Sequence, residues 1–208
     1  MRIPRPPLLL ITDRQQARGR LADIAGAAFS AGCRWASVRE KDLPRDEQIA
    51  LVREIKECAR RFDARVTLHG DPALAREAKA DGVHLAAGGD AAAARRMLGP
   101  AALVGLSIHT VAEARTANPA QVDYLIAGSL FESTSKPGHG PALGPDGLAK
   151  IVAAARVPVI AIGGIGAENA PVALKAGAAG VAVMGGLMRA ADPAAETRRL
   201  LAALGGRW

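Results

Sequence analysis

The sequence predicts an α/β protein, a single (β/α)8 TIM barrel over residues 1–208. Short apolar runs rich in Val, Ile and Leu alternate with longer helical patterns eight times, with no linker, repeat or low-complexity segment between them. The runs are apolar throughout rather than at every second residue, which indicates parallel strands buried on both faces. Strict strand–helix alternation over a chain of this length favours a closed barrel over a doubly wound open sheet.

The first four strand–helix pairs can be placed from their end signals. Gly32 closes the first helix, and Asp46 is a good N-cap for the second, whose apolar residues recur on one face. Pro72 suits the first turn of the third helix, where its missing N–H is not needed, and Asp90 caps the fourth. The expected strands are 8–12, 35–38, 66–68 and 82–85, and the expected helices are 18–31, 46–62, 72–80 and 91–98.

The last four pairs follow the same pattern. Thr110 caps the fifth helix, and a long polar loop from Ser129 to Pro145 separates the sixth strand from its helix. Gly177 closes the seventh helix. The expected strands are 103–107, 124–127, 157–162 and 180–184, and the expected helices begin after Thr110 and span 146–155, 167–176 and 193–204.

The composition limits the partners of such a barrel. The formal net charge is +7, but the Lys and Arg residues are scattered over the predicted helices, and only 3% of residues are aromatic. Without aromatic side chains between the cations for base stacking, we expect no nucleic-acid partner. Cys33 and Cys58 form neither a disulfide framework nor a metal-ligand pattern. The apolar run 8–11 is too short for a signal or membrane segment, so we expect a cytoplasmic protein with no membrane partner.

Glycine clusters follow the last two predicted strands. Gly163 and Gly164 come directly after the seventh strand, and Gly185 and Gly186 come after the eighth. Glycine N–H groups can approach an anion closely, and the loops after the last two strands of a (β/α)8 barrel are a frequent phosphate site. The plainer alternative is that these glycines only form tight turns. Their occurrence at matching places in two neighbouring units favours phosphate.

Polar side chains follow other predicted strands, at the end of the barrel where active sites of this fold lie. Arg39 and Lys41 follow the second strand, His69 follows the third, and Ser107 ends the fifth. A shared position would let the cations hold more than one phosphate, although each could instead be a separate surface charge. His69 is a candidate acid or base near neutral pH. His84 lies inside a strand and is expected to be a structural, hydrogen-bonded residue.

Five motifs occur in a fixed order over nearly the whole chain. They are Val38-Arg39-Glu40-Lys41, Asp81-Gly82-Val83-His84-Leu85, Gly105-Leu106-Ser107-Ile108-His109, the loop from Phe131 to Lys136, and Ala161-Ile162-Gly163-Gly164-Ile165. Together they resemble the thiamine phosphate synthase/TenI family. The resemblance implies a (β/α)8 barrel that acts on a small thiazole phosphate in vitamin B1 synthesis.

Two activities are implied by this resemblance. The synthase joins hydroxymethylpyrimidine diphosphate to the thiazole phosphate and releases pyrophosphate with Mg²⁺. The TenI-type protein is a tautomerase that aromatises the carboxythiazole phosphate.

The resemblance also implies roles for individual residues. The implied pyrophosphate site comprises Arg39, Lys41, Ser107 and Lys136, with Ser133 and Ser135 at two threonine positions of the family. The implied thiazole-phosphate cradle comprises Gly164, Met184 and Gly185, beside Gly163 and Gly186 of the glycine clusters, with Gly185 in place of a serine.

The chain departs from the synthase pattern at the magnesium ligands. His69-Gly70 stands where the synthase has Asn-Asp, and Ala86-Ala87-Gly88-Gly89 stands where it has Gly-Gln-Glu-Asp. Asp71 and Asp90 each lie one place further along, so they are the metal ligands expected if the chain is a synthase. Otherwise no metal and no cofactor is expected. Ser37 also replaces the glutamine that contacts the pyrimidine in the synthase.

Three functions follow as hypotheses. Diphosphate departure relies on the charge of a metal ion, so the missing carboxylates favour a TenI-like thiazole tautomerase in which His69, with Ser129 or Glu132, moves a proton. The first alternative is a thiamine phosphate synthase, because the tautomerase's catalytic histidine is replaced by Ser129. The second alternative is a non-catalytic binder or regulator that keeps the phosphate ligand. The sequence leaves a homo-oligomer open.

Overall fold

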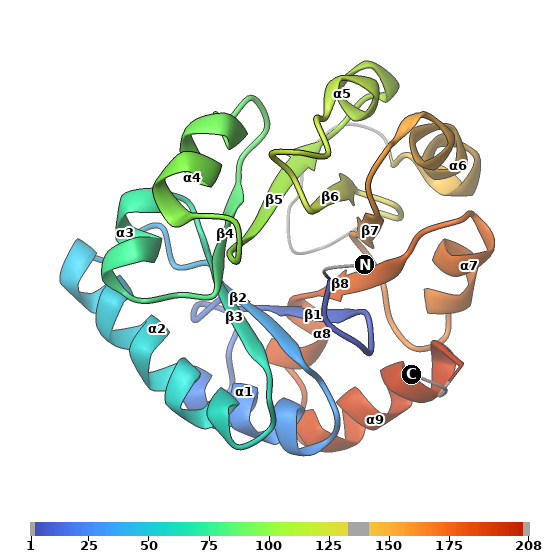
Figure 1. The fold of residues 1–208 in the computed structure, drawn as a ribbon. Coiled ribbons are helices and arrows are strands. Elements are labelled where there is room, and N and C mark those ends of the chain that lie inside the picture. Colours follow the sequence, from blue (N-terminus) through green and yellow to red (C-terminus); the bar gives the residue numbers. More distant parts are fainter. Residues whose placement is uncertain (1–2, 133–141, 206–208) are drawn as a thin grey trace.

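Eight parallel strands form the centre of the protein (Figure 1). The computed structural model describes residues 3–132 and 142–205. The strands pair in sequence order, and β1 pairs with β8 to close the barrel. The (β/α)8 TIM barrel predicted from the sequence is therefore confirmed. The strands are β1 Leu8–Ile11, β2 Trp35–Val38, β3 Arg65–His69, β4 Gly82–Leu85, β5 Leu103–Ile108, β6 Tyr124–Gly128, β7 Val159–Ile162 and β8 Gly180–Val183.

Helices surround the barrel (Figure 1). A helix follows each strand, and the last strand is followed by two, of which the first is a single short turn. The helices are α1 Leu21–Ser30, α2 Arg45–Arg60, α3 Pro72–Glu77, α4 Ala91–Leu98, α5 Val111–Thr116, α6 Gly144–Ala154, α7 Ala170–Lys175, α8 Gly185–Met188 and α9 Pro193–Ala203.

Inward-facing side chains fill the barrel. Trp35 on β2 and Tyr124 on β6 are fully buried and meet edge to face, with ring centroids 4.6 Å apart. This arrangement is a favourable one for two aromatic rings. Ile3 packs against the same cluster from the amino-terminal segment. The interior is therefore a packed core rather than a pore, as is usual for this fold.

A second apolar layer lies between the strands and the helices. Many of its side chains are alanines, including Ala25 and Ala28 on α1 and Ala94 on α4, all of them fully buried. Small side chains let the helices lie close to the barrel. A chain with few aromatic residues can therefore still form a dense outer core.

Two predicted helices begin later than expected, for reasons that involve other segments. The first starts at Leu21 instead of residue 18, because the N–H of Arg18 bonds to the carbonyl of Met188 at 3.0 Å. The seventh starts at Ala170 instead of residue 167. There the side chain of Asn169 accepts from Gly166 N–H at 2.9 Å and donates to the Gly164 carbonyl at 2.8 Å, which forms a loop before the helix.

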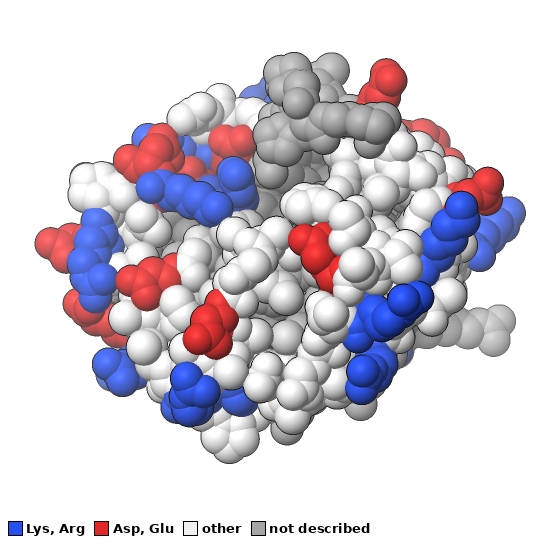
Figure 2. All heavy atoms as spheres, turned by 90° about the horizontal axis from the view of Figure 1, so that it is seen from above, with Lys and Arg blue, Asp and Glu red and all other residues white. Residues whose placement is uncertain are grey.

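Charged residues of both signs cover the surface. Figure 2 shows one face on which Lys and Arg lie in several separate groups, with Asp, Glu and uncharged residues between them. This distribution matches the scattered cations of the sequence. Among the helices of residues 3–132 and 142–205, none has the length and apolar character needed to cross a membrane.

Candidate active site

A cavity of about 450 Å³ opens at the carboxyl ends of the strands. All eight strands, or the loops directly after them, contribute to its lining. Its volume lies within the roughly 300–1,000 Å³ range of small-molecule sites. The cavity therefore stands where active sites of this fold lie.

Most of the predicted site residues meet in this cavity. The lining includes the three predicted catalytic residues and seven predicted binding residues, namely His69, Ser129, Glu132, Arg39, Ser107, Gly163, Gly164, Met184, Gly185 and Gly186. Lys41 is exposed and is not among the described lining residues. The predictions for Ser133, Ser135 and Lys136 fall on residues outside the described part of the chain.

The turn after β7 requires glycine on two grounds. Gly163 and Gly164 have φ angles of 104° and 63°, which other residues rarely adopt. A Cβ atom on Gly163 would lie 2.3 Å from Ser129 Oγ, and one on Gly164 would lie 2.5 Å from the Glu132 carbonyl oxygen. The loop after β6 therefore packs directly on this turn, held by hydrogen bonds from Leu130 and Phe131 N–H to backbone carbonyls of Ile162 and Gly163.

The N–H groups of this turn, those of Gly163 and Gly164, make no backbone hydrogen bond among the described loops and turns. Both residues line the cavity. The lack of side chains in this turn thus lets the loop after β6 pack on it, and its N–H groups can donate hydrogen bonds to an anion.

The glycines after β8 begin a helix instead of forming only a turn. Gly185 and Gly186 are the first two residues of α8, a four-residue helix that was not predicted from the sequence. The first N–H groups of a helix have no acceptor within it, so both donors remain available at the cavity edge. A glycine pair carries no signal of helix formation, and a helix this short has no apolar period to detect.

His84 contributes more to this site than the sequence suggested. It is expected to be structural and hydrogen-bonded, and its Nε2 does lie 2.9 Å from Oγ of Ser107. The ring is almost completely buried, yet it also lines the cavity. Burial, followed by the positive charge of Lys41, lowers the pKa of His84 to about 3. The imidazole is therefore neutral at physiological pH.

The register of β4 against β5, together with the alternation of side chains along strands, accounts for this pair. His84 pairs in register with Gly105, so Ser107 lies two residues further along β5 on the same inward face. The His69 ring is also near, with its centroid 5.0 Å from that of His84.

Arg39 lines the cavity, and Lys41, two residues along the chain, lies near it without lining the cavity. The backbone N–H of Arg39 donates to Thr12 Oγ1 at 2.9 Å, which joins the end of β2 to the end of β1. Partial burial, and second the charge of Arg39, lower the pKa of Lys41. The charge of Lys41 in turn acts on His84. Arg39 and Lys41 are thus near enough to influence each other electrostatically.

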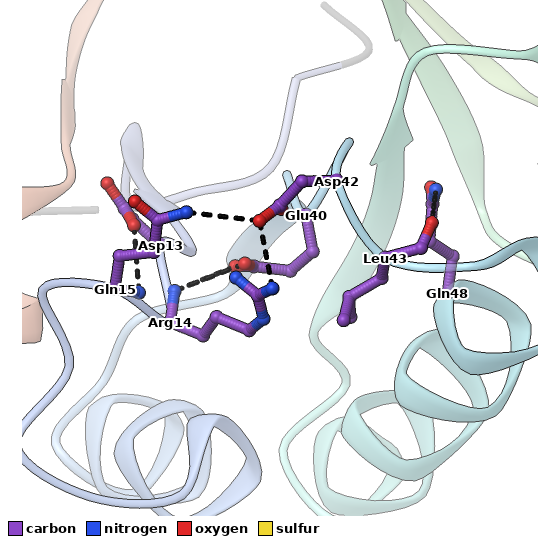
Figure 3. Close-up of polar contacts among 7 residues, drawn as sticks. All are labelled: Asp13, Arg14, Gln15, Glu40, Asp42, Leu43 and Gln48. Carbon is purple, nitrogen blue, oxygen red and sulfur yellow. Dashed lines mark hydrogen bonds and ion pairs between the residues drawn. The ribbon is translucent and has the colours of Figure 1, made fainter.

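Beside them, the loops after β1 and β2 form a polar brace (Figure 3). Both carboxylate oxygens of buried Glu40 accept from Arg14 N–H, at 3.2 and 3.1 Å. The Arg14 side chain pairs with Asp42 at 2.8 Å, and Gln15 Nε2 donates to the same carboxylate at 3.0 Å. Burial raises the pKa of Glu40. The brace fixes the loop that carries Arg39.

The predicted magnesium ligands serve a structural role. Asp71 caps α3 by accepting from Ala73 N–H at 2.7 Å, and Asp90 caps α4 by accepting from Ala93 N–H at 2.8 Å. Both are exposed, and neither is among the described residues that line the cavity. The described residues also hold no group of three or more His, Cys, Asp or Glu that could hold a metal ion. Asp71 and Asp90 are therefore helix caps in the described structure, and their role as magnesium ligands stays a prediction.

The closed barrel and its cavity, lined by glycine turns and cationic side chains, define a class of barrel proteins. In this class the loops after the last two strands frequently hold a phosphoryl group. A family model described as thiamine monophosphate synthase matches residues 8–187. The chain belongs to this family, which confirms the resemblance carried by its motifs.

Individual relatives agree with the family. A putative thiamine-phosphate synthase of Geobacter sulfurreducens is 40% identical over 199 residues, which cover 95% of this chain and 93% of that protein. The thiamine biosynthesis bifunctional protein ThiM/ThiE of Symbiobacterium thermophilum is 42% identical over 180 residues, which span 86% of this chain and 38% of that longer protein. The solved structure of thiamine phosphate pyrophosphorylase from Pyrococcus furiosus matches with a TM-score of 0.85 at 30% identity, covering 96% of this chain and 95% of that one.

These names bear on the choice between the two activities of the family. They place the chain among thiamine biosynthesis proteins of the thiamine-phosphate synthase family. The preference for a tautomerase finds no support in them. The synthase alternative fits them better.

Proposed function

We propose that this chain is a thiamine-phosphate synthase that joins hydroxymethylpyrimidine diphosphate to a thiazole phosphate and releases pyrophosphate. One observation carries the proposal. A single cavity is lined by the glycine turns after β7 and β8 and also by Arg39 and Ser107 from other strands. Such a cavity offers two separate places for phosphoryl groups, as a reaction between two phosphorylated molecules requires. The Geobacter sulfurreducens relative, similar over 95% of this chain, supports the same activity.

The thiazole phosphate is assigned to the glycine side. The N–H groups of Gly163, Gly164, Gly185 and Gly186 would donate to its phosphoryl oxygens, aided by the positive end of the adjacent backbone dipoles. Glycine at these positions lets the oxygens approach the main chain. This half of the site needs no cationic side chain.

The diphosphate is assigned to the side of β2 and β5. Arg39 can form two parallel hydrogen bonds to phosphoryl oxygens, and Lys41 adds a second positive charge. Ser107 supplies a hydroxyl at the same place. When the bond to the diphosphate breaks, its electron pair leaves with pyrophosphate, and these groups would balance the charge that develops there.

Magnesium has no assigned step in this proposal. Asp71 and Asp90 are used as helix caps, so the described residues give the metal no carboxylate inside the cavity from these two positions. Mg²⁺ commonly binds through substrate phosphates and retains several waters. The coupling assay therefore varies the Mg²⁺ concentration, while Arg39, Lys41 and Ser107 are the groups of this chain assigned to the developing charge.

The test is a coupling assay on the purified full chain. Hydroxymethylpyrimidine diphosphate and thiazole phosphate are supplied over a range of Mg²⁺ concentrations and with a chelator, and thiamine phosphate and pyrophosphate are quantified by chromatography. Formation of both products in equal amounts supports the synthase. A parallel incubation contains only the carboxythiazole phosphate tautomer. Aromatisation there, with no thiamine phosphate at any Mg²⁺ concentration, would replace the synthase by the tautomerase. Tight binding of thiazole phosphate with neither reaction would indicate a non-catalytic binder.

A further inference from the structure

We propose that His84 is a positioning residue that fixes the hydroxyl of Ser107 as a hydrogen-bond donor toward an oxyanion in the cavity. The assignment of that oxyanion as pyrophosphate rests on the proposed function. The hydrogen-bond direction rests on the geometry of β4 and β5. Nε2 of His84 lies 2.9 Å from Ser107 Oγ, and both residues line the cavity.

The other ring nitrogen determines which way this hydrogen bond runs. Nδ1 of His84 is buried and has no hydrogen-bond partner among the described residues. It faces Gly105, since a Cβ atom there would lie 2.5 Å from Nδ1 and 2.1 Å from Cζ of Tyr124. The Tyr124 ring stacks on the imidazole, with centroids 5.5 Å apart at an interplanar angle of 25°. The α-carbon of Gly105 and the phenol ring of Tyr124 therefore occupy the space beside Nδ1, and the Tyr124 hydroxyl makes no hydrogen bond to it among the described residues.

A neutral imidazole carries one N–H, so two arrangements must be compared. If the proton were on Nδ1, a buried N–H would have no acceptor, and such orphaned donors are rare in folded proteins. If the proton is on Nε2, only a lone pair on Nδ1 lacks a partner. The second arrangement is the less costly, so Nε2–H donates to Ser107 Oγ. The hydroxyl hydrogen of Ser107 is then directed away from His84 and toward the cavity.

Two neighbouring groups stabilise this arrangement. Lys41 acts on His84 with a positive charge, which disfavours a second proton on the ring. The His69 ring lies 5.0 Å from that of His84 and limits its rotation. A donor held in one direction costs little reorganisation when an anion binds. Ser107 therefore recognises acceptor oxygens, as in pyrophosphate.

The tautomer can be read directly from the unaltered protein. Two-dimensional ¹H–¹⁵N spectra of the ¹⁵N-histidine-labelled full chain distinguish a protonated from an unprotonated ring nitrogen. We expect His84 to be protonated on Nε2 alone, unchanged between pH 5 and pH 8. His84→Gln identifies its signals by their loss. A proton on Nδ1, or on both nitrogens in this range, would overturn the proposal.

Binding of inorganic pyrophosphate, measured by calorimetry, tests the consequence. Ser107→Ala should weaken binding roughly tenfold or more, because it removes a donor to a charged acceptor. His84→Leu should weaken it in the same direction, while His84→Gln, whose amide N–H can replace Nε2–H, should stay within about threefold of the wild type. The double variant Ser107→Ala/His84→Leu should bind no more weakly than Ser107→Ala.

The outcomes separate this proposal from the proposed function. Wild-type affinity in a folded His84→Leu variant would overturn the positioning role, whatever the coupling assay shows. Failure of the wild type to bind pyrophosphate would overturn the ligand assignment. An inactive wild type that shows the Nε2 proton and the predicted order of affinities would contradict the synthase activity and leave the positioning role supported.

Discussion

Arg95 and Asp123 form a buried ion pair at the end of the barrel opposite the cavity. Nη2 of Arg95, on α4, lies 2.5 Å from Oδ2 of Asp123, which directly precedes β6, and the side chains are only 14% and 5% exposed. The same carboxylate oxygen accepts from Val104 N–H at 2.8 Å, and Nη1 of Arg95 donates to the carbonyls of Gly99 and Ala102. One pair thus joins α4, β5 and the start of β6.

Asp123→Asn should lower the free energy of unfolding by about 3 kcal/mol, measured by urea denaturation. Asparagine keeps an acceptor for Val104 N–H but leaves the buried guanidinium without a counter-charge. The matched control is Glu57→Gln, which breaks an exposed pair with Arg60 whose side chains are 73% and 76% exposed, respectively. Glu57→Gln should lower the free energy of unfolding by less than about 1 kcal/mol. Equal losses of unfolding free energy in the two variants would contradict the conclusion that burial makes the Arg95–Asp123 pair contribute more than the exposed pair.

Glu40→Gln should make stability less dependent on pH. Burial raises the pKa of Glu40 in the folded protein. Below the ordinary glutamate pKa, protonated Glu40 makes its full contribution to the free energy of unfolding. This contribution is lost as the pH rises through the raised pKa of the folded protein. The glutamine side chain has the same shape and can still accept from Arg14 N–H. The variant should therefore gain free energy of unfolding relative to the wild type as pH rises from about 4 to 7. The check is urea denaturation of both proteins at several pH values, and a gain that shrinks over this range would contradict the raised pKa.

Gly105→Ala should destabilise the barrel by about 3 kcal/mol, at the upper end of overpacking costs. The added methyl group would lie 2.1 Å from Cζ of Tyr124 and 2.5 Å from Nδ1 of His84. Adding Tyr124→Leu removes the closest atoms, so the double variant should lose at least about 1 kcal/mol less than the sum of the single changes. Thermal and urea unfolding of the four proteins measures the coupling. Strict additivity would show that the methyl group is accommodated elsewhere.

Arg39→Gln should raise the KM for hydroxymethylpyrimidine diphosphate by roughly tenfold or more, because a charge-assisted pair of hydrogen bonds to phosphoryl oxygens is lost. The KM for thiazole phosphate should change little, since that phosphate is assigned to the glycine side. Arg61→Gln, at the exposed end of α2, is the control and should alter neither. Steady-state kinetics with each substrate varied in turn checks this. Equal increases for both substrates would contradict the division of the cavity.

The sequence predicted those strands and helix caps that depend only on the local pattern of residues. All eight strands follow from buried apolar runs, and Asp90 and Thr110 cap the helices they were expected to cap. Asp46 was expected at the cap of α2 but lies within its first turn, where a carboxylate also favours the start of a helix. The start of α1 was missed because it depends on a contact between Arg18 and Met188, which are far apart in the chain.

For the site, likewise, some features could be predicted from the sequence and others could not. The gathering of His69, Ser107 and the glycines follows from their positions after parallel strands. The bond between His84 and Ser107 could not be predicted without the register of β4 against β5. The capping role of Asp71 was also missed, since a carboxylate one place from a ligand position can equally serve as a ligand or as a helix cap.

The space over Gly105 is shared by His84 and Tyr124, and this affects how the barrel can be redesigned. A library that varies Gly105 alone would reject nearly every change, because any added side chain collides with His84 and Tyr124 while both remain. Productive variants at Gly105 require simultaneous replacement of a neighbour. Mutagenesis aimed at new ligands should therefore treat these positions as one unit when codons are chosen.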